Sequence, residues 1–206
     1  MRGWTKIAVA VALISPLSAV AARSDIAGIA AATYSTYSVP PPTRDNVFIC
    51  HGFTCKYIVQ VDLTEADRAK LTRMLAPGKA SPEAERRAVA AAGAWFDRRI
   101  APAAGTQNHV AHAGYVYMYN PHQFDCIDSS RNTTSLLLLL DQLDLLRHHT
   151  VDVPVSRGLW LGGQSPHTTA VLVETKSGAK WSVDSWTRGY GAAPEVMPLS
   201  RWVTIK

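Results

Sequence analysis

The chain has 206 residues, of which 47% are hydrophobic and 18% are charged, a balance that suits one domain with an ordinary apolar core. Its formal charge is +5, from 21 basic and 16 acidic side chains, and these charges are scattered rather than clustered. A modest and scattered positive charge gives no footprint for nucleic acid, so we exclude that class of partner.

The first 21 residues have the composition of a secretory signal peptide. Arg2 and Lys6 form a basic start, residues 7–20 are apolar, and residues 19–21 give the small-x-small pattern that signal peptidase cleaves. The alternative is an uncleaved membrane anchor, but the stretch is short for a span of about 20 residues and contains a proline. We therefore expect cleavage, no stable membrane insertion, and a periplasmic or secreted protein whose mature charge is +3, because the leader carries two basic residues and no acids.

Three cysteines occur in the chain, at positions 50, 55 and 126. In an oxidising compartment a nearby pair of cysteines tends to close, and an odd one stays free. Cys50 and Cys55 flank a short glycine-containing turn between two stretches that are typical of strands, so a disulfide would join the arms of a hairpin. A Cys-x4-Cys pair also occurs in metal sites, but no second pair completes one in this sequence. We therefore expect a Cys50–Cys55 disulfide and a free thiol at Cys126.

The rest of the chain is organised as one domain behind a short leader. Residues 22–46, rich in Ala, Ser, Thr and Pro, are expected to form a flexible lead-in, and residues 47–206 the domain itself. Capping signals predict one helix over about 64–76 and a second over about 82–100, ending before Pro102. The arginines of the second helix are expected on a solvated face, with a docking patch as the alternative.

The segment after position 120 predicts a helix that begins at a cysteine. Asp125 is a good N-cap, and the residues that follow predict a helix from Cys126 to about Leu146. The five leucines at 136–140 cover the whole circumference of such a helix, which predicts that it is buried on every side. A thiol at a helix N-terminus is favoured as thiolate by free N–H groups, and these groups can also bind an oxyanion.

Two predicted strands downstream carry a histidine and an aspartate. One strand opens with His167, the next contains Asp184, and a turn at 175–178 separates them. A four-residue loop places Asp184 opposite Thr169, diagonal to His167 on the same face of the sheet. A thiol nucleophile needs a base, and the base needs an orienting acceptor, so we expect Asp184 to accept the Nδ1–H of His167. The spacing is consistent with a Cys–His–Asp triad.

In this order the motifs resemble those of the bacterial transglutaminase-like cysteine peptidases, a family of the papain-like and transglutaminase-like superfamily. The resemblance rests on Asp125-Cys126-Ile127-Asp128 followed by a long helix, then the strand that opens with His167, then Val183-Asp184-Ser185-Trp186. It implies an α+β fold in which the nucleophile-bearing helix packs on a small antiparallel sheet, with extra helices before it. It also implies hydrolysis of a protein or peptide substrate, with Cys126, His167 and Asp184 as nucleophile, base and orienting group.

The resemblance also bears on cofactors and on the neighbours of the triad. Some periplasmic members that process adhesins bind calcium through acidic residues around the nucleophile. Ile127 stands where those members have an acidic residue, so the sequence does not favour calcium and we expect no cofactor. Asp128 is expected to support the first helical turn rather than chemistry. Gln123 and His122 are weaker candidates for a second oxyanion donor.

Plainer interpretations remain open for each feature. A cysteine in a leucine-rich helix is usually a packing residue, a strand histidine is often structural, and an aspartate can simply begin a turn. His109 and His112 lack a nearby acidic partner in the sequence and do not predict a metal site. Within enzymes, an amine in place of water would resolve the thioester, as in a transglutaminase or another amide-transferring enzyme. Outside enzymes, the same fold would serve as a non-catalytic exported interaction domain.

Overall fold

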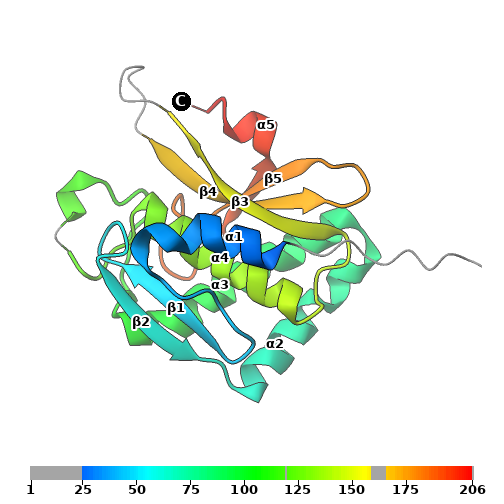
Figure 1. The fold of residues 1–206 in the computed structure, drawn as a ribbon, viewed down its shortest axis with the longest axis horizontal. Coiled ribbons are helices and arrows are strands. Elements are labelled where there is room, and N and C mark those ends of the chain that lie inside the picture. The colour runs from blue at the N-terminus through cyan, green and yellow to red at the C-terminus, as the bar shows by residue number, and fades with distance from the viewer. Residues whose placement is uncertain (1–24, 119, 159–165, 206) are drawn as a thin grey trace, which may run out of the picture.

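The computed structural model describes residues 25–118, 120–158 and 166–205, so the expected signal peptide at 1–21 lies outside the described residues. The protein has a mixed α+β fold with two antiparallel sheets, one of two strands and one of four, and helices between and around them (Figure 1). No helix in the described part of the chain is long and apolar enough to cross a bilayer.

The strands are β1 (Asn46–His51), β2 (Tyr57–Asp62), β3 (His149–Arg157), β4 (His167–Glu174), β5 (Lys180–Asp184) and β6 (Glu195–Pro198). β1 and β2 form a hairpin, and β3 to β6 are neighbours in chain order. In the register of β4 on β5, Ala170 pairs with Val183, which is the register expected from a four-residue turn. The β3–β4 register shifts between Asp152 and Val155, which marks a bulge in β3.

The helices are α1 (Ile26–Tyr34), α2 (Glu65–Leu75), α3 (Pro82–Ala104), α4 (Cys126–Gln142) and α5 (Leu199–Trp202), with 3-10 turns at Ser35–Tyr37, Ala76–Ala80 and Tyr115–Tyr117. α4 occupies the centre of the fold. It lies between the four-strand sheet on one side and a layer formed by α3 and the β1–β2 hairpin on the other (Figure 1). The helix that begins at the cysteine is therefore enclosed by both layers.

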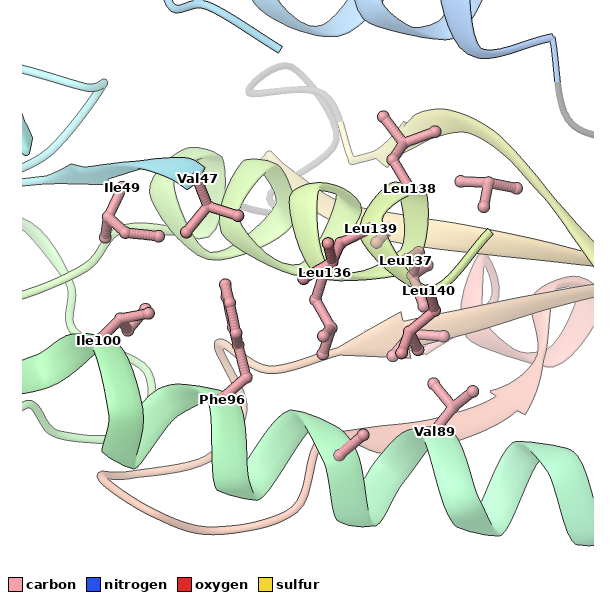
Figure 2. Close-up of a cluster of buried hydrophobic side chains, with 14 of the residues drawn as sticks. Val47, Ile49, Val89, Phe96, Ile100, Leu136, Leu137, Leu138, Leu139 and Leu140 are labelled. Carbon is pink, nitrogen blue, oxygen red and sulfur yellow. The ribbon is translucent and has the colours of Figure 1, made fainter. Parts of the chain in front are cut away.

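The leucine run of α4 forms the centre of the hydrophobic core, as predicted. Leu136–Leu140 are each at most 1% exposed. Figure 2 shows these side chains beside Val47 and Ile49 of β1 and beside Val89, Phe96 and Ile100 of α3. Burying one leucine side chain contributes about 1.5–3 kcal/mol, so this cluster anchors α4 and the residue at its N-terminus.

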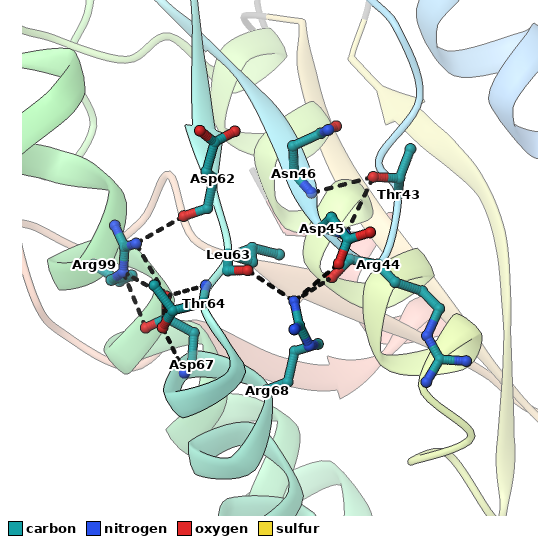
Figure 3. A network of polar contacts seen from close by, with 10 residues as sticks. All are labelled: Thr43, Arg44, Asp45, Asn46, Asp62, Leu63, Thr64, Asp67, Arg68 and Arg99. Atoms are coloured by element: carbon teal, nitrogen blue, oxygen red, sulfur yellow. Dashed lines mark hydrogen bonds and ion pairs between the residues drawn. The ribbon is translucent and has the colours of Figure 1, made fainter.

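A polar clamp joins the start of α2 to α3 and to the hairpin (Figure 3). Thr64 and Asp67 form the predicted capping box of α2, and the guanidinium of Arg99 on α3 binds the Asp67 carboxylate at 3.0–3.1 Å. Arg99 also donates to the carbonyl oxygen of Asp62 at the end of β2. The arginines of α3 are thus not all on a solvated face, since Arg99 ties three elements together.

Some local predictions differ from the structure. The expected flexible lead-in contains α1, because Tyr34 is buried and its hydroxyl hydrogen-bonds to Ser135 of α4 at 2.7 Å. α3 continues past Pro102, which lies in its last turn. α4 ends at Gln142 rather than near Leu146, and β3, which the sequence did not predict, follows shortly afterwards.

Candidate functional site

His167 and Asp184 lie side by side on the four-strand sheet, as their spacing predicts. β4 begins at His167 and β5 ends at Asp184. His167 Nε2 lies 2.6 Å from Asp184 Oδ2, and both side chains are buried. The turn between the strands sets this pairing, because its register places Asp184 diagonal to His167 on one face of the sheet.

The imidazole is oriented through the opposite nitrogen to the one expected. We predicted that Asp184 accepts the Nδ1–H of His167, but the carboxylate binds Nε2. Because Nε2–H donates to the carboxylate, the neutral ring has no proton on Nδ1, which is then able to accept one. Nδ1 is buried and makes no hydrogen bond with any described residue. The open base nitrogen of His167 is therefore Nδ1.

Trp202 completes the surroundings of Asp184. Trp202 of α5 is buried, and its Nε1–H donates to Asp184 Oδ2 at 2.8 Å. The guanidinium of Arg157 lies over the Trp202 ring, 4.3 Å from its centre, and donates to the Trp202 carbonyl oxygen. Trp186 packs against the imidazole of His167, with ring centres 4.6 Å apart. No motif or spacing marked Trp202, because α5 reaches Asp184 only through tertiary packing.

Cys126 is the first residue of α4, and its thiol faces the start of β4. The thiol donates to the carbonyl oxygen of Pro166 across 3.9 Å, and the backbone N–H of Thr168 lies near enough to act on the pKa of the thiol. Pro166 and Thr168 flank His167 in the chain, so the thiol lies against the stretch of backbone that carries the imidazole. The structure thus places the thiol against the backbone that flanks His167, and the thiol and Nδ1 are not hydrogen-bonded to each other.

Burial governs the protonation of the thiol. It raises the pKa of Cys126 to about 11; the negative charges of Asp125 and Asp184 act in the same direction, while the N–H of Thr168 acts in the opposite one. The expectation of a thiolate stabilised by the helix N-terminus is therefore wrong for this arrangement. At neutral pH the thiol keeps its proton, so attack on a carbonyl requires a base close to the sulfur.

The turn of the β1–β2 hairpin is closed by the predicted disulfide. Cys50 and Cys55 are joined, and Cys126 is the free cysteine. Between the two sulfurs the backbone turns through four consecutive residues with positive φ, 78° at Gly52 followed by 70°, 51° and 55° at residues 53–55. Left-handed conformations are unfavourable for residues other than glycine, so the turn needs support from its surroundings.

Two carboxylates of the helix start provide that support. Asp128 accepts the N–H of Phe53 at 2.8 Å and that of Cys55 at 2.7 Å, and Asp125 accepts the N–H of Thr54 at 2.9 Å. Burial and the charge of Asp125 raise the pKa of Asp128 to about 7. Asp128 thus supports the first helical turn, as expected, and it also joins that turn to the disulfide-closed hairpin.

The same contacts decide whether a calcium ion fits beside the nucleophile. All four carboxylate oxygens of Asp125 and Asp128 accept backbone N–H groups, and oxygens aimed at donors are poorly placed to bind a cation. Among the described residues, Cys50, Cys55 and Asp128 lie close enough together for a metal, but the two sulfurs are bonded to each other. The residues around Cys126 therefore do not fit calcium.

The N-cap of α4 uses most of the N–H groups that the sequence offered for an oxyanion. Asp125 accepts the N–H groups of Ile127 and Asp128 through its side chain, and its carbonyl oxygen accepts that of Ser129. The N–H of Cys126 instead lies against its own sulfur. Among the N–H groups of the first helical turn, it is the one that the Asp125 cap does not bind, and hence the donor that remains for a developing oxyanion.

The two side chains considered as a second oxyanion donor are engaged elsewhere. Gln123 accepts the N–H of Val110 at 2.9 Å and donates to the carbonyl oxygen of Asn108 at 3.2 Å, so its amide braces the loop before α4. The ring of His122 lies against Gly105 at the end of α3. Neither contact directs a donor toward Cys126.

His109 has in the structure the acidic partner that it lacked in the sequence. Its Nε2 lies 3.0 and 3.1 Å from the two carboxylate oxygens of Asp97 on α3, and Asp97 also accepts the N–H of Gly191. His112 instead packs edge-on against Trp186, with ring centres 5.0 Å apart. One imidazole and one carboxylate are too few ligands for a structural zinc site. The His109–Asp97 pair instead holds the loops that contain His109 and Gly191 against α3.

Comparison with known proteins does not identify a relative. No protein-family model, no curated protein and no solved structure matches the chain. Function must therefore be inferred from the site itself, that is, from the geometry and chemistry of Cys126, His167 and Asp184.

Proposed function

We propose that the chain is an exported cysteine peptidase that works by acyl transfer, with Cys126 as nucleophile, His167 as base and Asp184 as orienting group. One observation carries the proposal: Asp184 binds His167 through Nε2, while Nδ1 has no partner among the described residues and the groups on either side of His167 contact the thiol. Buried polar atoms in a purely structural role are nearly always hydrogen-bonded, so a buried open nitrogen calls for a function.

In the proposed reaction the protonated thiol is activated when substrate reaches it. Nδ1 of His167 takes the thiol proton, and the sulfur of Cys126 attacks the carbonyl carbon of the scissile bond. The N–H of Cys126 binds the oxyanion that forms. The imidazolium, stabilised by Asp184, then gives its proton to the leaving amine as the carbon–nitrogen bond breaks, and a thioester remains on Cys126.

Water completes the cycle in a peptidase. Nδ1 takes a proton from water, the resulting hydroxide attacks the thioester, and Cys126 leaves and regains a proton from the imidazolium. An amine that took the place of water would form a new amide, which is the transglutaminase alternative. Mass spectrometry of the products formed in the presence of a primary alkylamine distinguishes hydrolysis from amine transfer. Hydrolysis leaves a free carboxylate, whereas amine transfer leaves an amide.

The proposal also includes the type of α+β core and the compartment of the protein. α4, with its thiol at the N-terminus, packs on the antiparallel sheet that carries the histidine and the aspartate. This arrangement supports a papain-like or transglutaminase-like core with α1, α2 and α3 added before it. The Cys50–Cys55 disulfide suits an oxidising compartment, and so supports a periplasmic or secreted protein.

The nucleophile can be tested without the natural substrate by using p-nitrophenyl acetate, a small activated ester. The wild-type protein should release p-nitrophenol and carry an acetyl group on the peptide that contains Cys126. Cys126→Ala should lose both signals and keep its unfolding midpoint, because the thiol packs at the edge of the core. Release of p-nitrophenol by Cys126→Ala at the wild-type rate would remove Cys126 as the nucleophile.

The base can be tested by alkylating the thiol with iodoacetamide across pH. If Nδ1 takes the proton, wild-type Cys126 should react faster at pH 7 than Cys126 in His167→Ala. The two rates should converge as the pH approaches about 11, where the thiol ionises without help. A non-catalytic interaction domain predicts superimposable profiles for the two proteins.

A further inference from the structure

A groove of about 350 Å³ runs along the first turns of α4. Ile127, the residue after the nucleophile, and Thr168, the residue after His167, are among its lining residues. The bulged part of β3 and the end of α1 form the remaining walls, with Pro154 and Thr33 among the lining residues. The groove is therefore placed to receive a part of the substrate next to the bond that is attacked.

Among the described residues that line this groove, Arg131 is the only charged one. Its guanidinium is held in position from two sides: Nε donates to the carbonyl oxygen of Thr33 at 3.0 Å, and the group lies over the ring of Tyr37, 4.0 Å from its centre. Its two terminal nitrogens have no hydrogen-bond partner among the described residues. The side chain is thus fixed in orientation while its terminal donors stay free.

The charge of Arg131 is not neutralised by an ion pair in the described part of the chain. The nearest carboxylates, Asp125 and Asp128, act on it at a distance, because their oxygens are already bound to the N–H groups of the hairpin turn. Burial accordingly lowers the pKa of the guanidinium. A partly buried cation without a paired carboxylate is costly, so its retention beside a groove needs an explanation.

We propose that the groove is a subsite for an acidic side chain of the substrate, aspartate or glutamate, close to the scissile bond, and that Arg131 binds its carboxylate. The two terminal nitrogens of a guanidinium match the two oxygens of a carboxylate, and fixing the guanidinium in advance reduces the entropy lost on binding. None of the described lining residues is acidic, so none of them competes for the guanidinium. This inference rests on the proposed function, and it names the substrate class that the same site would prefer.

The test uses two affinity labels that differ only in charge, chloroacetyl-Gly-Asp amide and chloroacetyl-Gly-Asn amide. In both, the sulfur of Cys126 displaces chloride from the chloroacetyl carbon and a thioether forms. The second-order rate of labelling is measured by mass spectrometry for each compound, with iodoacetamide as a reference for the reactivity of the thiol. We expect the Asp label to react roughly tenfold faster than the Asn label at low salt, and the advantage to shrink in high salt.

Two variants locate the source of the preference. Arg131→Gln should bring the two rates together, while Arg73→Gln, which makes the same change of charge at an exposed position on α2, should leave the preference intact. Because Arg131 also contacts Tyr37 and Thr33, the comparison of the two labels on the wild-type protein provides a test that does not depend on the stability of the variant.

The outcomes separate this inference from the proposed function. Fast labelling by iodoacetamide with equal rates for the Asp and Asn labels would leave the nucleophile in place and overturn the acidic subsite. A preference for the Asp label that survives in Arg131→Gln would also overturn it, because another group would then bind the carboxylate. If His167→Ala labels with iodoacetamide as fast as the wild type at every pH, the proposed function fails and the subsite falls with it.

Discussion

Two histidines of the four-strand sheet, His149 on β3 and His167 on β4, are each buried against a carboxylate, and the two pairs differ in the contacts of the second ring nitrogen. In the first pair, His149 Nδ1 donates to Glu85 at 2.7 Å and Nε2 accepts from Arg86 at 3.2 Å. In the second pair, His167 Nε2 donates to Asp184 at 2.6 Å and Nδ1 has no partner among the described residues. Both ring nitrogens of His149 are therefore hydrogen-bonded, and we call His149–Glu85 the closed pair. Only one ring nitrogen of His167 is hydrogen-bonded to a described residue, and we call His167–Asp184 the open pair.

The carboxylates of the two pairs also differ in how many hydrogen bonds they accept. Glu85 also accepts the backbone N–H groups of Arg147 at 2.5 Å and His148 at 2.8 Å, so it fastens the chain that leads into β3 to α3. Among the described residues, the Asp184 carboxylate accepts one hydrogen bond besides that from His167, and it comes from Trp202. A saturated pair holds structure together, whereas a pair with a free nitrogen beside a thiol can move a proton. Burial of a histidine next to an acid is therefore not enough to identify a catalytic dyad.

The largest expected effect is the loss of turnover when the His167 imidazole is removed. His167→Ala should lower turnover of p-nitrophenyl acetate by about 10²–10⁴, because the thiol then has no base at neutral pH. His149→Ala is the matched change in the closed pair, and it should lower stability while leaving the turnover of each folded molecule near the wild-type value. Both are read by steady-state rates normalised to the folded fraction from circular dichroism. Equal losses of turnover in the two variants would contradict the distinction.

A smaller effect is expected from Asp184→Asn. An amide at this position can turn its NH₂ group toward Nε2, which favours the tautomer that carries its proton on Nδ1 and so closes the base nitrogen. The corresponding change in serine proteases costs about 10⁴ in turnover, and a cysteine enzyme depends less on the third group, so we expect a loss on the order of 10–10³. A folded Asp184→Asn protein with full activity would remove Asp184 from the site.

Glu85→Gln should lower stability and leave turnover unchanged, whereas Asp184→Asn should lower turnover. Loss of the buried charge weakens three hydrogen bonds at once, those from His149 and from the backbone N–H groups of residues 147 and 148, so we expect destabilisation of about 3 kcal/mol. Urea unfolding followed by fluorescence measures this change. Turnover of the folded fraction should stay unchanged, and a large loss of turnover without a loss of stability would mean that the closed pair also serves the reaction.

Trp202→Phe tests the hydrogen bond that the Asp184 carboxylate receives from Trp202. Phenylalanine keeps most of the ring packing but removes the N–H donor to the carboxylate, so we expect a loss of turnover of about tenfold or less. Because the change acts through Asp184, it should also alter the pH dependence of Cys126 alkylation. Loss of stability with an unchanged pH profile would show that Trp202 is only a packing residue.

The smallest effect concerns acid stability. Burial acts to raise the pKa of Glu85, but hydrogen bonds from His149 and from the N–H groups of residues 147 and 148 outweigh it, so its pKa lies below the usual 4.5. The stability that Glu85 contributes is therefore present above its unfolded pKa and is lost as the pH falls through its folded pKa. In urea unfolding below pH 5, wild type should lose more stability than Glu85→Gln. Parallel losses in both proteins would contradict this assignment.

Several elements were predictable because their signals are local. The capping box at Thr64, the N-cap at Asp125 and the Cys50–Cys55 disulfide each depend on residues a few positions apart. The register that pairs His167 with Asp184 was predictable for a related reason, since the length of a hairpin loop sets which residues of its two strands face each other. β3 was missed because its pattern is interrupted by Pro154 and by the bulge, so it shows no regular alternation.

The sequence by itself determined the order of the three candidate residues and the elements that carry them. Only the tertiary structure decided that Asp184 binds Nε2 and leaves Nδ1 open, that Trp202 closes on the carboxylate, and that Cys126 keeps its proton. The physical reason is that a ring orientation and a thiol pKa depend on burial and on charges brought together from distant parts of the chain. Periodicity and spacing in the sequence indicate which face of an element a side chain occupies, but they do not indicate which groups contact that side chain in the folded protein.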